Sequence, residues 1–137
     1  MSELVVLKDS LWFSRQKIAG QAVSLALKTF HDRLKSKEKT SLIDIENDSL
    51  VILNSLNCTP TFYGFHGFPS KVCLSVNNQL VHGIVTDYVL QESDVVTLDL
   101  GATFEGAIAD AALTCIYGEP KNEQHVKMLS LCQLALN

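Results

Sequence analysis

Two aspartates stand out in the sequence because each interrupts an apolar run with the character of a β-strand. Asp99 follows residues 95–98, and Asp110 lies within residues 107–117. Burying an unpaired carboxylate is costly, so each would need a cation, a network of hydrogen-bond donors or a raised pKa. The turn signal Glu105-Gly106 separates the two runs and therefore predicts a β-hairpin that carries both carboxylates.

The spacing predicts that the two carboxylates face each other. With a two-residue turn at Phe104-Glu105, Asp99 pairs directly with Asp110 and both side chains lie on the same face of the sheet. Like charges so placed are destabilising unless a cation lies between them, and a divalent metal ion suits oxygen ligands. A bulge at Gly106 would shift the register by one residue. Alternatively, both aspartates are strand-end residues that cap backbone groups, and the spacing alone leaves this open.

Helices are predicted on both sides of the strands. Ser10 would cap a helix over residues 11–34, and Ser41 with Asp44 resembles a capping box at the start of a helix ending near residue 56. Apolar residues recur at helical spacing in both helices and are expected to form core. An amphipathic helix is expected from about residue 122, with one side formed by Val126, Leu129 and Gln133.

The segment between the second helix and the hairpin has loop and strand character. Residues 59–70 combine prolines and glycines with aromatic residues, residues 72–76 alternate as in a strand, and Asn77-Asn78 is typical of a turn. The order of helix, helix, antiparallel strands and helix is an α+β pattern, and the length of 137 residues suits one domain or one lobe.

The composition excludes several classes of protein. A net charge of −4 with 47% hydrophobic residues is globular and lacks the basic surface of a nucleic-acid-binding protein. The basic residues 33–39 are interpreted as a solvated helix end. The four cysteines form no Cys-x-x-Cys pair, and the apolar residues 4–7 are too few for a signal core or a membrane span. We therefore expect a cytoplasmic protein with reduced thiols and no nucleic-acid or membrane partner.

Residues 63–84, YGFHGFPSKVCLSVNNQLVHGI, closely resemble a segment of the type I methionine aminopeptidases. In that family a Gly-Tyr-His-Gly-aromatic-Pro loop precedes Cys-x-Ser-hydrophobic-Asn and then His-Gly-Ile. Residues 94–101 and 106–114 resemble the hairpin that carries the family's first two metal ligands. The likeness is strong over residues 61–119 and continues more weakly through the two preceding helices.

The resemblance implies a fold and a reaction. The fold would be the first lobe of a pita-bread aminopeptidase, in which two similar αβ lobes surround a central sheet, so residues 1–137 would be a single partial domain. The reaction would be the hydrolytic removal of the N-terminal methionine from newly made polypeptides whose second residue is small. Two divalent metal ions (Co, Mn, Fe or Zn) would activate water and polarise the scissile carbonyl. The complete enzyme would be a monomer.

The resemblance also assigns roles to residues. Asp99 would bind one metal ion and Asp110 would bridge two, while His82, as the catalytic residue, would contact substrate near the scissile amide. Four residues would line the pocket for the methionine side chain: Phe62, Phe65, Phe68 and Cys73. Aromatic rings and a sulfur suit a thioether, although without the family they would be interpreted as core and His82 as structural. His66 would be a structural or supporting residue that does not bind metal.

The chain departs from the family in two places. Val85 stands where the family usually has proline, and the Ala-Ile-Ala sequence of residues 107–109 stands where aromatic-His-Gly is common. Both changes keep the strands but are expected to alter the wall near the metal ions.

Part of the family's site is absent from the sequence. The family adds one histidine and two glutamates from its second lobe, which no residues after Asn137 supply, and His125 is not their equivalent. We therefore expect a piece of a longer enzyme that is inactive by itself. The alternatives are a truncated, non-catalytic module that binds peptide N-termini or a partner protein, and a proline-specific aminopeptidase or creatinase-like relative. That relative would share the aspartate hairpin but not residues 73–82.

Overall fold

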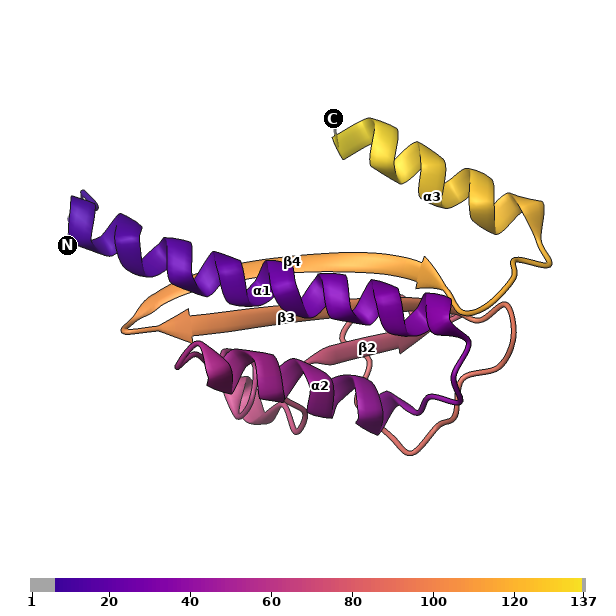
Figure 1. The fold of residues 1–137 in the computed structure, drawn as a ribbon, viewed down its shortest axis with the longest axis horizontal. Coiled ribbons are helices and arrows are strands. Elements are labelled where there is room, and N and C mark those ends of the chain that lie inside the picture. Colours follow the sequence, from indigo (N-terminus) through magenta and orange to yellow (C-terminus); the bar gives the residue numbers. More distant parts are fainter. Residues whose placement is uncertain (1–6, 137) are drawn as a thin grey trace.

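The computed structural model describes residues 7–136, which form a helical layer packed on one face of an antiparallel sheet (Figure 1). Residues 1–6 and 137 lie outside the described residues, and with them most of the apolar run 4–7. The elements follow in the order α1 (Ser10–Ser36), α2 (Leu42–Ser55), β1 (Thr59–Pro60), the 3-10 turn η1 (Phe65–Gly67), β2 (Cys73–Val76), β3 (Val95–Phe104), β4 (Ala107–Ile116) and α3 (Glu123–Leu136). This order confirms the predicted α+β pattern.

Helix α1 begins at Ser10, one residue earlier than predicted, and its N-cap is the residue before the predicted cap. The carboxylate of Asp9, not the hydroxyl of Ser10, accepts a hydrogen bond from the Trp12 N–H at 2.7 Å, so Asp9 is the N-cap. The prediction of Ser10 as the cap was therefore wrong, because adjacent Asp and Ser residues are nearly equal capping residues. Lys37 ends the helix in the left-handed conformation, with φ 61°.

The capping box predicted for α2 is confirmed. The Ser41 hydroxyl accepts from the Asp44 N–H at 3.2 Å, and the Asp44 carboxylate accepts from the Ser41 N–H at 2.8 Å and from its hydroxyl at 2.7 Å. These donors favour the ionised carboxyl and hold the pKa of Asp44 below its usual range.

The Asp44 cap makes part of the stability pH-dependent. Because the folded pKa is lowered, this contribution is present at neutral pH and is lost as the pH falls through that pKa. Asp44→Ala is expected to cost about 1 kcal/mol at pH 7 and less at pH 3, measured by urea unfolding. Asp87→Ala removes an exposed carboxylate without a hydrogen-bond partner in the described residues, and serves as the control. An Asp44→Ala cost that stayed the same at both pH values would contradict this prediction.

Strand β3 is the centre of the sheet. Strands β1 and β2 pair along one edge of β3 and β4 pairs along the other, all antiparallel. Strand β3 extends to Phe104, beyond the predicted residues 95–100. Between β3 and β4, Glu105 and Gly106 both have positive φ, 44° and 82°, as a type I′ hairpin turn requires.

This turn corrects the predicted register. Phe104 pairs with Ala107, so Asp99 lies opposite Ala112 and Asp110 lies opposite Gly101. The two aspartates are therefore diagonal neighbours, and the prediction that they pair directly was wrong by two residues. A shift of two residues keeps the side-chain alternation, so both carboxylates still lie on one face, as predicted.

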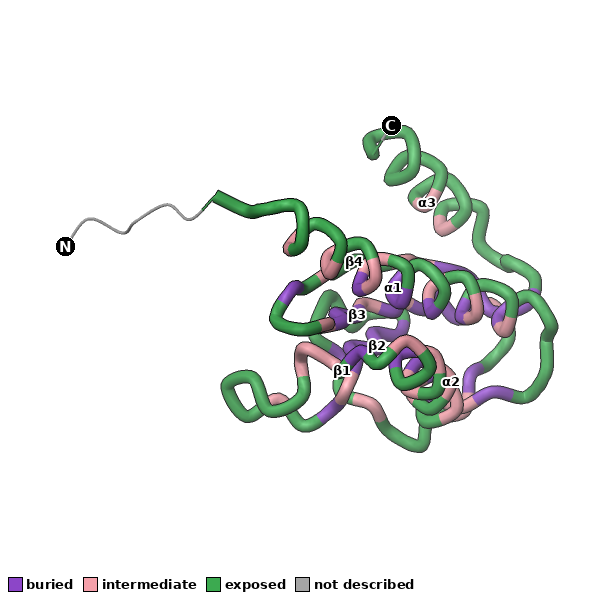
Figure 2. Tube along the Cα trace, turned by 60° about the vertical axis from the view of Figure 1, so that its left-hand side comes forward, coloured by how far each residue is buried: buried purple, intermediate pink, exposed green. Residues whose placement is uncertain are grey.

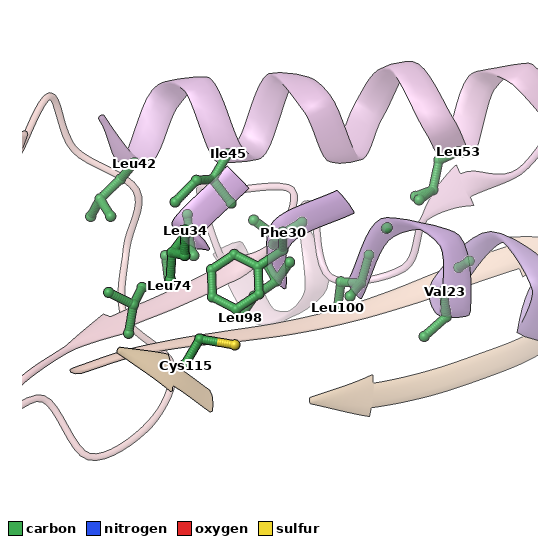
Figure 3. Packing of buried hydrophobic residues seen from close by; sticks show 14 of the residues in the cluster. Val23, Phe30, Leu34, Leu42, Ile45, Leu53, Leu74, Leu98, Leu100 and Cys115 are labelled. Carbon is green, nitrogen blue, oxygen red and sulfur yellow. The ribbon is translucent and has the colours of Figure 1, made fainter. Parts of the chain in front are cut away.

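The hydrophobic core lies between the helices and the even-numbered side of β3 (Figure 2). Figure 3 shows Leu42, Ile45 and Leu53 of α2 pointing toward the leucines of β2 and β3. Fully buried positions on the sheet side are Leu74, Val96, Leu98, Leu100 and Ala102. The odd-numbered side chains of β3 point to the opposite face, which no helix of the described residues covers.

Helix α3 forms where an amphipathic helix was predicted, but it stands away from the sheet (Figure 1). None of its described residues is buried, so its expected apolar side, with Val126 and Leu129, makes no core contact. Within residues 7–136, no helix has both the length and the apolar character needed to cross a membrane.

Candidate active site

The open face of the sheet carries a cavity of about 590 Å³ that brings the predicted site residues together. It is lined by Phe62, Phe65, His66, Gly67, Phe68, Pro69, Cys73, His82, Asp99 and Asp110. These residues come from the loop after β1, from β2, from the loop before β3, and from both arms of the hairpin. Every residue predicted to bind metal or substrate lies in this lining.

The carboxylates of Asp99 and Asp110 form the polar end of the cavity. Asp99 is half-buried and Asp110 is exposed. Burial raises the pKa of Asp99 because it disfavours the charged carboxylate, and the neighbouring Asp110 raises it further because two negative charges repel each other. Nearby His82 opposes this shift. The pair therefore shows the repulsion that a bound cation would remove.

Cys73 lies directly opposite Asp99 on β2 and is buried. Burial, together with the charges of Asp99 and Asp110, raises the pKa of its thiol to about 11. The sulfur is therefore a neutral thiol at physiological pH, which suits an apolar wall.

The aromatic wall depends on one glycine of β3. The Thr61 N–H donates to the Gly101 carbonyl at 3.0 Å, and a Cβ at Gly101 would lie 2.8 Å from the Thr61 Cβ and 3.0 Å from the Phe62 ring. The absence of a side chain lets Phe62 lie against the strand beside Asp99. Further along the loop, the rings of Phe65 and His66 meet edge to face at 4.4 Å, with His66 in a left-handed conformation.

His82 reaches the cavity from the loop between β2 and β3. It is exposed and has a φ of 55°, an uncommon conformation for a residue with a side chain. The next residue, Gly83, is buried against β2. The histidine is thus presented to the cavity by a backbone fixed immediately after it.

Sequence reasoning missed Asp94, which anchors the same loop. Its buried carboxylate accepts hydrogen bonds from the Tyr88 hydroxyl at 2.9 Å, the Asn77 amide at 2.8 Å and the Gln91 N–H at 2.8 Å. A third aspartate before an apolar run was a signal of such a network, because buried carboxylates need donors or cations.

Of the three residues 107–109, which differ from the family pattern, only one lies on the face of the sheet that carries the aspartates. Among residues 107–109, only Ile108 shares the face of Asp110, because side chains alternate along β4. Ala107 is buried and Ala109 packs against the core. Ile108 is therefore the changed residue that borders the carboxylates.

The described residues fit part of a metal site. Two carboxylates that share a face and repel each other are hard ligands suited to a divalent ion. Among residues 7–136, no group of three or more His, Cys, Asp or Glu side chains could hold a metal ion. The hairpin would thus contribute two ligands, and a tight site would need others.

Comparison with known proteins agrees with this geometry. Residues 14–137 match the sequence profile of the family described as Metallopeptidase family M24. The chain belongs to metallopeptidase family M24. It is 30% identical over 133 residues to a methionine aminopeptidase of Mycoplasma capricolum, covering 97% of this chain and 52% of that protein. It is 37% identical over 108 residues to a methionine aminopeptidase of Helicobacter pylori, covering 77% of this chain and 42% of that protein.

Solved structures of M24 peptidases share the fold. The crystal structure of methionine aminopeptidase from Thermotoga maritima matches with a TM-score of 0.85 and 31% identity, covering 93% of this chain and 50% of that one. X-Pro aminopeptidase from Thermotoga maritima matches with a TM-score of 0.67 and 20% identity, a likeness of fold alone. The chain spans about half the length of the curated relatives it matches.

These matches confirm the predicted likeness to the N-terminal portion of type I methionine aminopeptidases and the partial pita-bread lobe. The individual roles of His82, Asp99, Asp110 and the aromatic residues stay predictions, as does the single partial domain over residues 1–137.

Proposed function

We propose that this M24 chain supplies the first half of the active site of a metal-dependent methionine aminopeptidase. The complete enzyme would remove the N-terminal methionine from newly made polypeptides whose second residue is small. One observation carries the proposal: a single cavity joins an apolar aromatic wall to two adjacent carboxylates. The relatives named methionine aminopeptidase support it.

The apolar part of the cavity suits a methionine side chain. Phe62, Phe65 and Phe68 offer aromatic faces, and Cys73 offers a neutral, polarisable sulfur. Thioethers interact favourably with aromatic rings, and a cavity of about 590 Å³ leaves room for the residue and part of the chain behind it. These four residues would select methionine over polar residues, which would leave hydrogen-bonding groups unsatisfied.

The polar end would hold the metal ions. Asp99 would bind one and Asp110 would bridge two, chosen from Co, Mn, Fe or Zn. When bound, divalent ions lower the pKa of water and polarise the scissile carbonyl. The exposed imidazole of His82 would bind the substrate near its scissile amide and donate a hydrogen bond to the charge that develops there. We expect this enzyme to act as a monomer in the cytoplasm, on peptide N-termini.

The proposal is tested with the complete protein, a divalent salt and three peptides. With Mn²⁺ or Co²⁺, we expect methionine release from Met-Ala-Ser, little release from Met-Leu-Ser, and none of alanine from Ala-Ala-Ser. Excess EDTA should abolish the activity and added metal should restore it. Equal cleavage of all three peptides, or cleavage insensitive to EDTA, would rule the proposal out.

The second candidate is a non-catalytic module that binds peptide N-termini or a partner protein. It is favoured by the absence of a three-ligand group in the described residues. It predicts that the 137-residue chain binds Met-Ala-Ser through the aromatic wall but releases no methionine.

A further inference from the structure

Leu80, Val81 and His82 form a loosely held part of the loop between β2 and β3. Within the described residues, no main-chain group of Leu80, Val81 or His82 makes a hydrogen bond. Leu80 is 89% exposed and Val81 is 62% exposed, so their side chains hold little of the loop in place. On the preceding side the nearest hydrogen-bonded residue is Gln79, three positions before His82, whereas Gly83 directly after His82 is hydrogen-bonded to β2. The residues that follow His82 therefore constrain it most directly.

Three hydrogen bonds join those residues to the segment around β2. The Leu74 N–H donates to the Gly83 carbonyl at 3.0 Å, and the Gly83 N–H donates to the Ser75 hydroxyl at 3.1 Å. The Val85 N–H donates to the Ser70 hydroxyl at 3.0 Å. Both serines are about 95% buried, with exposed fractions of 5% for Ser70 and 4% for Ser75.

The backbone of Gly83 lies so close to β2 that a side chain would not fit between them. A Cβ there would lie 2.1 Å from the Leu74 carbonyl oxygen, so the loop is pressed directly against β2. The strand itself is fixed by its pairing with β3, in which Cys73 lies opposite Asp99. The loop after His82 and the carboxylate of Asp99 are thus positioned by the same strand.

Val85 occupies the position at which type I enzymes usually have proline. A proline ring restricts the backbone but offers no N–H, so it cannot donate a hydrogen bond to Ser70. In this chain the N–H is present, and a buried hydroxyl accepts it. The hydrogen bond constrains the same stretch of backbone that the ring would constrain.

We propose that the hydroxyls of Ser70 and Ser75 are positioning groups for His82, with the Ser70–Val85 hydrogen bond replacing the constraint of a proline. The catalytic part of this inference rests on the proposed function, since it takes His82 to bind substrate. The positioning itself is a property of the chain and can be measured without activity.

The test is a double-mutant cycle between Ser70→Ala and Val85→Pro in the 137-residue chain. By NMR, we expect Ser70→Ala to speed hydrogen exchange of the Val85 amide about fivefold and to shift the His82 ring signals. In the Val85→Pro background, Ser70→Ala should leave the His82 signals unchanged, because no donor remains. Unchanged exchange and unchanged His82 signals in Ser70→Ala would overturn the proposal.

Two control variants separate positioning from general loss of packing. Val85→Ala trims the side chain but keeps the N–H, so it should retain the slow exchange at residue 85. Ser49→Ala removes another buried hydroxyl, which donates to the Ile45 carbonyl within α2, and should not move His82. If Ser70→Ala does not fold, Val85→Pro tests the replacement by itself: it removes the same bond from the donor side but supplies the constraint of the ring, so the His82 signals should stay at their wild-type positions. A shift of those signals in Val85→Pro would contradict the replacement.

In the complete enzyme, Ser70→Ala should lower kcat for methionine release more than it raises KM. When the enzyme already carries Val85→Pro, adding Ser70→Ala should not change kcat further. Shifted His82 signals in an enzyme that releases no methionine would refute the proposed function and leave the positioning intact. Normal methionine release with an unaltered kcat in Ser70→Ala would refute the positioning alone.

Discussion

Asp99→Asn is expected to make the metal-free chain more resistant to unfolding while, in the complete enzyme, lowering methionine release by at least about 100-fold. The carboxylate of Asp99 is half-buried and shares a face with Asp110, so its charge is unfavourable in the metal-free chain. Asparagine keeps the shape, removes the charge and donates a hydrogen bond to Asp110. It is also a poor metal ligand, so stability and activity should move in opposite directions.

The stabilisation should depend on pH in a defined sense. Burial and Asp110 raise the pKa of Asp99 in the folded chain. The wild-type chain is therefore more stable at low pH, where this carboxyl is protonated, and it loses this stability as the pH rises through the folded pKa. The excess stability of Asp99→Asn should therefore be present at pH 7 and fade toward pH 4. Thermal unfolding in EDTA across this range measures it. A lower melting temperature than wild type at pH 7 would contradict the proposed repulsion.

Asp94→Asn is the matched control. Asp94 is also buried and lies at the start of β3, but its carboxylate accepts three hydrogen bonds. An amide nitrogen cannot accept, so this variant should be destabilised by about 1–3 kcal/mol. The same substitution is thus expected to have opposite effects at Asp94 and Asp99.

Gly83→Ala is expected to destabilise the chain by about 2–3 kcal/mol and to displace His82 from the cavity. The new Cβ would lie 2.1 Å from the Leu74 carbonyl oxygen and 2.9 Å from the Ser75 Cα, both of them backbone atoms of a paired strand. Because β2 cannot retreat without breaking its pairing with β3, the loop must move. Methionine release should then fall together with stability, as measured by urea unfolding and by a peptide assay of the complete enzyme.

Gly20→Ala provides the comparison for a glycine without contacts. Nothing lies within 4 Å of a Cβ at Gly20, which is in the interior of α1. Alanine favours helix over glycine by up to about 1 kcal/mol, so this variant should be neutral or more stable. A similar loss of stability in both variants would show that the close contact at Gly83 is not the cause.

The type and order of the elements could be predicted because hydrophobic periodicity and capping signals are local. The Ser41 and Asp44 box depends on residues three positions apart, and the structure keeps it. The register of the hairpin depended on which residues form the turn. Glu105 and Gly106 adopt the positive φ values of a type I′ turn, so the turn lies one residue later than predicted and Asp99 pairs with Ala112, two residues from its predicted partner.

The contents of the cavity were predicted by resemblance, since spacing along the chain does not bring Phe62 near Asp99. That contact requires the small cross-section of Gly101, which a sequence pattern does not distinguish from other strand glycines. The hydroxyls of Ser70 and Ser75 gave no signal, because serine is mostly solvent-exposed in proteins and only packing shows that these two are buried.

The two carboxylates lie on adjacent arms of one tight hairpin, eleven residues apart in the chain. Closing so short a loop is fast, whereas pairing β1 with β3 joins distant parts of the sequence and is slower. We therefore expect the unfavourable pair of charges to come together before β1 joins the sheet. A divalent ion present at that stage would favour closure of the hairpin and so speed the assembly of the sheet around it.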